Sequence, residues 1–200
     1  MRPLQTPAPK IGQPAHGVRQ QGFSMTELIV VMLIVGILAA IGAPSFKYVT
    51  TSNRIAAEIN GLVGDLEYAR SLAIKQGEIV TVCASASGAA CDGGNNWQSG
   101  WIVFLDSSTA GARGTLDAGE AIVRVQPAFN PPGDTLLPLG GANLNAVSFN
   151  RVGYGSLLGN AGTVTLALHD SSNTSQWTRC VQLSAVAMLT VETVNQGACL

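Results

Sequence analysis

The sequence predicts an α+β protein in which one long N-terminal helix packs against an antiparallel β-sheet head. Three observations predict this class. Residues 23–43 form an apolar run with a single charged side chain, Glu27. An apolar stripe of helical period follows, from Ile55 to Ala73. Beyond Gly77 the chain changes to short β-rich runs separated by turn clusters, and no further amphipathic helix is evident.

Composition excludes several classes of protein. The chain has 200 residues, 46% of them hydrophobic and 12% charged. It is too apolar for an intrinsically disordered chain, and its length suits one domain with an appendage. Residues 1–22 hold three basic side chains and no acid, so residues 23–200 carry 8 basic and 12 acidic side chains, a net charge of −4. Bulk charge therefore gives no reason to expect a nucleic-acid partner.

Residues 1–22 are rich in Pro, Gln and Gly and are expected to form an unstructured leader. The run that follows reaches roughly 30 Å as a helix, which is enough to cross a bilayer core over about residues 23–44. Its basic N-terminal flank predicts a cytoplasmic N-terminus. The remainder, with all four cysteines, is then expected on the far side of the membrane, in an oxidising compartment.

The helix is predicted to extend from about Phe23 to Gln76. Pro44 is expected to bend or locally open the helix rather than end it, because helical patterning resumes after it. Lys75 and Gly77 supply a stop signal. The apolar stripe, with Asp65 among the polar residues placed off it, consists of Ile55, Ile59, Leu62, Leu66, Ala69 and Ala73.

Residues 77–200 are predicted to form the β-rich globular head. Antiparallel strands in a meander, packed on the apolar stripe of the helix, are the economical arrangement. The expected strands are Ile79–Ala84, Trp101–Leu105, Ala121–Gln126, Ala146–Asn150, Val164–Leu168, Cys180–Leu183 and Leu189–Val194.

Glu27 is the most informative single residue. A carboxylate within a membrane span costs several kcal/mol unless it is paired, and such residues are usually functional. One reading places Glu27 near the edge of the span, where its side chain reaches water. The sharper reading pairs it with the amino group that cutting after Gly22 would create on Phe23 of a neighbouring copy.

The junction Gly22-Phe23-Ser24-Met25-Thr26-Glu27-Leu28 resembles the cleavage and methylation motif of type IV pilins and type II secretion pseudopilins. The resemblance implies a type IV pilin-like fold, cleavage between Gly22 and Phe23 by a prepilin peptidase, and N-methylation of Phe23. It also implies a role for Glu27 in assembly with other pilins or pseudopilins.

A second resemblance, to the GspH/FimT group, covers the chain from Gly22 to about Val186 and implies a minor pseudopilin or minor pilin in or near the tip of a periplasmic filament. The members of that group that bind DNA carry a basic element near the C-terminus, whereas residues 184–189 here have no positive charge. The residues that carry the resemblance are Asp65, Glu67, Ala69, Arg70, Ser71, Ala73, Gly77, Val80, Cys83, Trp97, Gly100, Trp101, Val103, Phe104, Asp106, Gly114, Asp117, Gly119, Glu120, Arg124, Phe149, Arg151, Gly153, Arg179 and Cys180.

The cysteines are expected to form structural disulfides. Four cysteines permit three pairings, and we favour the two local ones, Cys83 with Cys91 and Cys180 with Cys199. A zinc site is not expected, because no two cysteines are two to four residues apart and His169 is the only histidine after the leader.

No enzymatic activity, metal or cofactor is expected. Asp106, Asp117 and Glu120 lack the spacing of a twelve-residue calcium loop and are expected to be solvated acids of hairpins. One histidine without a nucleophile signature predicts no catalytic triad.

The favoured hypothesis is an inner-membrane minor pseudopilin of the type II secretion system, equivalent to its H subunit. It would be single-pass, with a cytoplasmic N-terminus and a periplasmic head, and would contact other pseudopilins and the prepilin peptidase/methyltransferase. Three alternatives remain: a minor pilin of a type IV pilus, a DNA receptor for uptake, and an exported protein whose ordinary signal peptide is cut near Gly42.

Overall fold

The computed structural model describes residues 22–107, 113–130, 132–194 and 199, so nearly all of the expected leader lies outside the described residues. The chain divides into two compact units, one ending at Ser45 and one running from Phe46 to Leu200. The second unit contains both β-sheets and the second half of the helix, so the helix contributes to both units.

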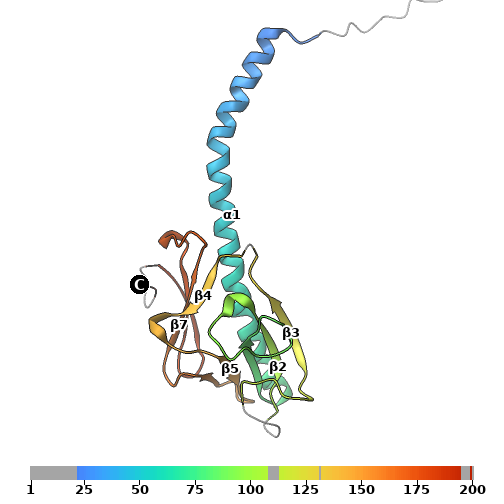
Figure 1. The fold of residues 1–200 in the computed structure, drawn as a ribbon, viewed down its shortest axis with the longest axis vertical. Helices are drawn as coiled ribbons and strands as arrows, with labels where there is room; N and C mark the ends of the chain where they lie inside the picture. Colours follow the sequence, from blue (N-terminus) through green and yellow to red (C-terminus); the bar gives the residue numbers. More distant parts are fainter. Residues whose placement is uncertain (1–21, 108–112, 131, 195–198, 200) are drawn as a thin grey trace, which may run out of the picture. The chain divides into compact units, whose positions relative to one another are not determined.

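Helix α1 spans Met25–Gln76 (Figure 1). It begins two residues later than predicted, and its hydrogen-bonded helical structure passes through position 44, so the expectation that the proline does not end the helix is confirmed. At its C-terminus the Gly77 N–H donates to the Ala73 carbonyl at 2.9 Å. Gly77 has a φ of 72°, the left-handed conformation that favours glycine after a helix.

The strands of the second unit form two antiparallel sheets, with orders β3-β2-β1-β5-β6 and β4-β7-β8-β9. The first sheet comprises β1 Val80–Ala84, β2 Gly100–Leu105, β3 Ile122–Pro127, β5 Ala146–Phe149 and β6 Gly155–Leu158. The second comprises β4 Thr135–Pro138, β7 Val164–His169, β8 Arg179–Leu183 and β9 Leu189–Thr193.

All seven predicted strands are present, with no end shifted by more than one residue, and the predicted fold class is confirmed. The predicted meander is wrong. The chain leaves the first sheet after β3, forms β4 in the second sheet, returns for β5 and β6, and completes the second sheet with β7 to β9. The sequence prediction missed β4 and β6, because each has only four residues and contains a proline or a glycine.

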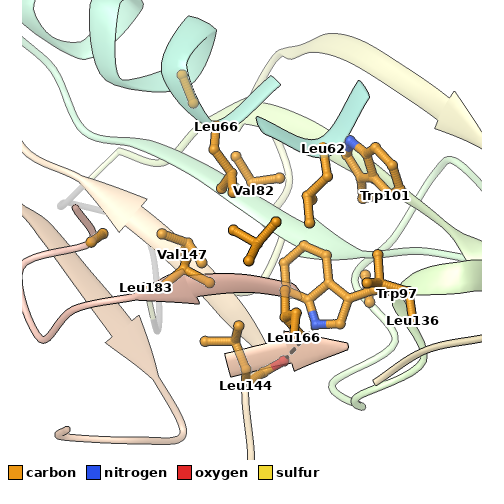
Figure 2. Packing of buried hydrophobic residues seen from close by; sticks show 14 of the residues in the cluster. Leu62, Leu66, Val82, Trp97, Trp101, Leu136, Leu144, Val147, Leu166 and Leu183 are labelled. Carbon is orange, nitrogen blue, oxygen red and sulfur yellow. Dashed lines mark hydrogen bonds between the residues drawn. The ribbon is translucent and has the colours of Figure 1, made fainter. Parts of the chain in front are cut away.

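One hydrophobic core joins the helix to both sheets (Figure 2). The predicted stripe of α1 is fully buried in it, from Ile55 to Ala73. Trp97 lies in the same core, and its indole Nε1 donates to the Leu144 carbonyl at 3.0 Å, which satisfies the polar atom of this large side chain. Sheet residues that line the core include Val80, Val82, Val147, Leu166, Leu168 and Val181.

Candidate functional site

The N-terminal junction consists of Gly22, Phe23 and Ser24 followed by the first turn of α1. The Leu28 N–H donates to the Ser24 carbonyl at 3.1 Å, which makes Ser24 the residue that opens the helix. Glu27 lies in the first turn, where a carboxylate interacts favourably with the helix dipole. Ser24 and Glu27 also have the spacing of a capping box, a local signal that the sequence analysis overlooked.

The large apolar side chains in the described part of the first unit are exposed. Every large apolar side chain from Leu28 to Ile41 is about half exposed or more, with Val31 the lowest at 49%. Soluble monomers rarely expose a contiguous apolar surface of more than a few hundred Å². α1 is the described helix that is long and apolar enough to cross a membrane. This surface therefore needs lipid or other helices around it.

Asp65 connects the helix to the first sheet. Its carboxylate accepts a hydrogen bond from the Trp101 indole at 2.8 Å and forms an ion pair with Arg124 of β3. The Arg124 guanidinium also lies 4.8 Å from the ring centroid of Tyr68. Asp65 was predicted to lie off the buried stripe, but it is 5% exposed. A buried carboxylate is stable here because two donors satisfy it.

Arg54 and Glu58 connect the helix to the loops beside the second sheet. The Arg54 guanidinium contacts both oxygens of Asp134, with Nε 2.9 Å from Oδ2 and Nη2 3.2 Å from Oδ1. The Ser171 N–H donates to the same carboxylate at 2.9 Å. Burial and the nearby Asp134 charge raise the pKa of Glu58 to about 7, while Arg54 acts in the opposite direction.

Arg70 makes a third connection. Its Nη2 donates to the Ala187 carbonyl in the β8–β9 turn, and its guanidinium lies 5.2 Å from the ring centroid of Phe149. Asp65, Trp101, Arg124, Arg70 and Phe149 all belong to the motifs singled out in the sequence. In the structure they hold the helix to the sheets, so these motifs encode the architecture of the head.

Both favoured disulfides are present. Cys83 at the end of β1 is bonded to Cys91, and Cys180 of β8 is bonded to Cys199, each with a Cα–Cα distance of 5.6 Å. The first closes the loop after β1, and the second fixes the end of the chain to the second sheet. Among the described residues every cysteine is therefore in a disulfide.

The acids after β2 are not simply solvated, which corrects the sequence prediction. Asp106 is 3% exposed and accepts hydrogen bonds from Thr81 Oγ1 at 2.7 Å and the Gly114 N–H at 3.1 Å. Glu120 accepts from the backbone N–H groups of Ser107 and Asp117, at 2.7 and 2.9 Å. These carboxylates organise their own loop. Within the described ranges, no group of three His, Cys, Asp or Glu side chains is placed to hold a metal ion.

A polar pocket of about 670 Å³ opens where α1, β2 and β5 end. Two arginines and two acids line it, and one of these acids, Asp106, is already hydrogen-bonded within the loop after β2. The lining residues are Gly77, Glu78, Ile79, Asp106, Ser107, Arg113, Asn150, Arg151 and Val152.

Comparison with known proteins identifies two matching family models. The model described as "Type II transport protein GspH" matches residues 58–187, and the "Prokaryotic N-terminal methylation motif" matches residues 18–43. No curated protein sequence matches the chain.

Among solved structures, the fold is similar to that of the type IV minor pilin FimU of Pseudomonas aeruginosa. One crystal form has a TM-score of 0.51 at 19% identity and covers 70% of this chain and 89% of FimU. A second crystal form has a TM-score of 0.48 at 19% identity and covers 68% of this chain and 91% of FimU. At this identity the likeness shows a shared fold: a long N-terminal helix with an antiparallel β-sheet head.

Proposed function

The chain belongs to the GspH family of type II transport proteins, and on that premise we propose that it is a minor pseudopilin of the type II protein secretion system. In this role it resembles the H subunit and assembles into the periplasmic pseudopilus near its tip. The coarser assignment, to the minor pseudopilins and pilins, follows directly from the family and the fold.

The observation that carries the proposal is the exposed apolar surface of α1 directly after a methylation motif. After cleavage behind Gly22, residues 23–43 would anchor the chain in the inner membrane as a single span. In the filament the same side chains would pack against the helices of other pseudopilins. The proposed role is assembly, and it requires no catalytic group or cofactor from this chain.

The proposed topology places the N-terminus in the cytoplasm and the head in the periplasm. The basic N-terminal flank of the span supports this orientation, and so do the disulfides Cys83–Cys91 and Cys180–Cys199 in the head. The partners are other pseudopilins and the prepilin peptidase/methyltransferase.

A minor pilin of a type IV pilus is the second candidate, since the fold is shared with FimU, a minor pilin. Uptake of DNA is less well supported. The β8–β9 turn, where DNA-binding relatives are expected to be basic, exposes the apolar side chains of Val186 and Met188 instead.

Deletion of the gene in its own cell, with secreted proteins and surface pili measured separately, distinguishes these candidates. We expect loss of secretion with pili retained, and restoration by the parent chain. Gly22→Val is the matched control. A Cβ at Gly22 meets no atom of the described residues within 4 Å, so we expect the fold to be kept while cleavage is blocked, and secretion should not return. Loss of pili with normal secretion would support the second candidate, and no change in either would contradict both.

A further inference from the structure

We infer that an exposed apolar patch on the second unit is a contact surface for the head of a neighbouring subunit in the same filament. This inference rests on the proposed function, because it assumes a filament. The patch, here called the Tyr154 patch, consists of Ile74, Val152, Tyr154, Val186 and Met188.

The five side chains come from three separate segments and are unusually exposed for their size. Ile74 of the last turn of α1 is 54% exposed, and Val152 and Tyr154 of the β5–β6 turn are 68% and 62% exposed. Val186 and Met188 of the β8–β9 turn are 42% and 64% exposed. Apolar groups that gather from three segments indicate an interaction site more strongly than single exposed side chains do.

One side-chain contact and one backbone hydrogen bond bring the three segments together. A Cβ at Gly153 would lie 2.9 Å from Ile74 Cδ1, so the β5–β6 turn packs tightly on the end of the helix. The Gly155 N–H donates to the Val186 carbonyl at 3.0 Å, which joins the β5–β6 turn to the β8–β9 turn. The patch is therefore preformed, and docking would require little ordering of the chain.

The β8–β9 turn is built to present its apolar side chains outward. Ala187 is fully buried and has a φ of 53°, a left-handed conformation that is unfavourable for a non-glycine residue. Arg70 donates to its carbonyl and holds the turn against the helix. Val186 and Met188, on either side of Ala187, are both exposed. Residues held in such backbone conformations cluster at functional sites.

The charges around the patch indicate the chemistry of the partner. Lys75 follows Ile74 and Arg151 precedes Val152, and both side chains are exposed. Neither forms an ion pair among the described residues, whereas Arg54, Arg70 and Arg124 do. The matching partner surface has an apolar centre and an acidic rim.

The area of the patch favours a neighbour that is already held in place. Five such side chains, about half exposed, present on the order of 500 Å² of apolar surface, near the upper end for a monomer. A stable complex in solution requires about 800 Å² per partner. The patch alone is too small for a free dimer, but it suffices between filament subunits whose helices already raise their effective concentration.

A nucleic acid fits this surface less well. Stacking on Tyr154 would be available, but Lys75 and Arg151 are the only cations adjacent in sequence to the patch, and affinity for DNA depends on neutralising several phosphates. The observations therefore favour a protein surface.

The experiment uses the full chain in its own envelope, with the photocrosslinker p-benzoylphenylalanine replacing Tyr154 or, separately, Leu33 of the apolar helix. We expect adducts with other pilin-class subunits from both positions. Met188→Arg should lower the adduct yield at position 154 at least tenfold and leave the yield at position 33 unchanged. The matched control is Val125→Arg, also at a half-exposed apolar residue but on β3, at the opposite edge of the first sheet from β6. It should leave both yields unchanged.

Each other outcome has a defined meaning. Two outcomes would overturn the inference and leave the proposed function intact. One is adducts at position 33 with none at position 154, and the other is an adduct at position 154 that Met188→Arg does not reduce. Absence of pilin-class adducts at position 33 would contradict the proposed function itself. An adduct of position 154 with DNA would overturn the protein-contact inference. Protease resistance and disulfide formation in Met188→Arg establish that the variant is folded.

Discussion

Replacing Glu58 by Gln should stabilise the head above pH 7. The Glu58 side chain is 9% exposed and lies beside Asp134, so its ionised carboxylate loses water and gains a like charge. Arg54 compensates only in part, because its guanidinium is already engaged by both oxygens of Asp134. Glutamine keeps the shape of the side chain and remains neutral at every pH.

The magnitude and the sign follow from linkage between protonation and folding. The folded-state pKa of Glu58 is raised from 4.5 to about 7, so the folded state binds more protons than the unfolded state between these values. The contribution of Glu58 to stability is therefore fully present below pH 4.5, falls as the pH rises, and is lost above pH 7. One pKa unit corresponds to about 1.4 kcal/mol, and solvent screening reduces the full value, so a loss of about 1–3 kcal/mol is expected.

The assay is denaturant unfolding of the full chain in detergent micelles from pH 4 to pH 9, followed by tryptophan fluorescence. The difference in free energy of unfolding between Glu58→Gln and the parent should grow by about 1–3 kcal/mol in favour of the variant between pH 4.5 and pH 7.5. Glu67→Gln, at an exposed residue paired with Arg70, is the control and should change stability by less than about 0.5 kcal/mol. A difference for Glu58→Gln that does not vary with pH would refute the reasoning.

Three further predictions concern processing, disulfides and DNA. N-terminal sequencing and intact mass should show a mature chain that begins at methylated Phe23, whereas a start near Ala43 would remove the filament hypothesis. Replacing Cys180 and Cys199 together by Ser should lower the free energy of unfolding by about 2–4 kcal/mol, because the bond constrains the unfolded chain; an unchanged midpoint in denaturant would contradict this. Duplex DNA should not shift with the full chain at physiological salt, because residues 23–200 carry a net charge of −4; sub-micromolar binding that weakens steeply with salt would overturn it.

The sequence predicted most of the fold because its strongest signals are periodic. The buried stripe from Ile55 to Ala73 repeats every three or four residues, and burial on one helix face requires that spacing. The seven predicted strands are apolar or β-branched runs bounded by turn residues, a pattern that is also local. The two disulfides followed from cysteines close together in the chain.

The parts that were missed depend on contacts between distant segments. Asp65 is polar, so local pattern placed it outside the core, yet Trp101 and Arg124, 36 and 59 residues away, satisfy it there. The split into two sheets is set by which strand pairs with which, and β4 and β6 are too short to carry a signal of their own. The pairing of Arg54 with Asp134, 80 residues apart, is invisible to any sequence window.

We propose two physical roles for Glu27, which substitutions at this position can separate. At the start of α1 its carboxylate would stabilise the helix in two ways. It lies at capping-box spacing from Ser24, and it interacts favourably with the helix dipole. In the proposed filament it pairs with the methylated amine of Phe23 on a neighbouring subunit, because an unpaired carboxylate among apolar helices is costly. Glutamine retains capping ability and removes the charge, whereas aspartate retains the charge on a shorter side chain.

The most direct test of assembly is to count crosslinks between this chain and other pilin-class subunits in cells that carry Glu27→Ala, Glu27→Gln or Glu27→Asp. We predict that all three variants are cleaved after Gly22 and embedded in the membrane, that Ala and Gln abolish the crosslinks, and that Asp retains part of them. If Glu27→Ala and Glu27→Gln crosslink and support secretion like the parent, the charge pairing is wrong and Glu27 serves the start of the helix alone.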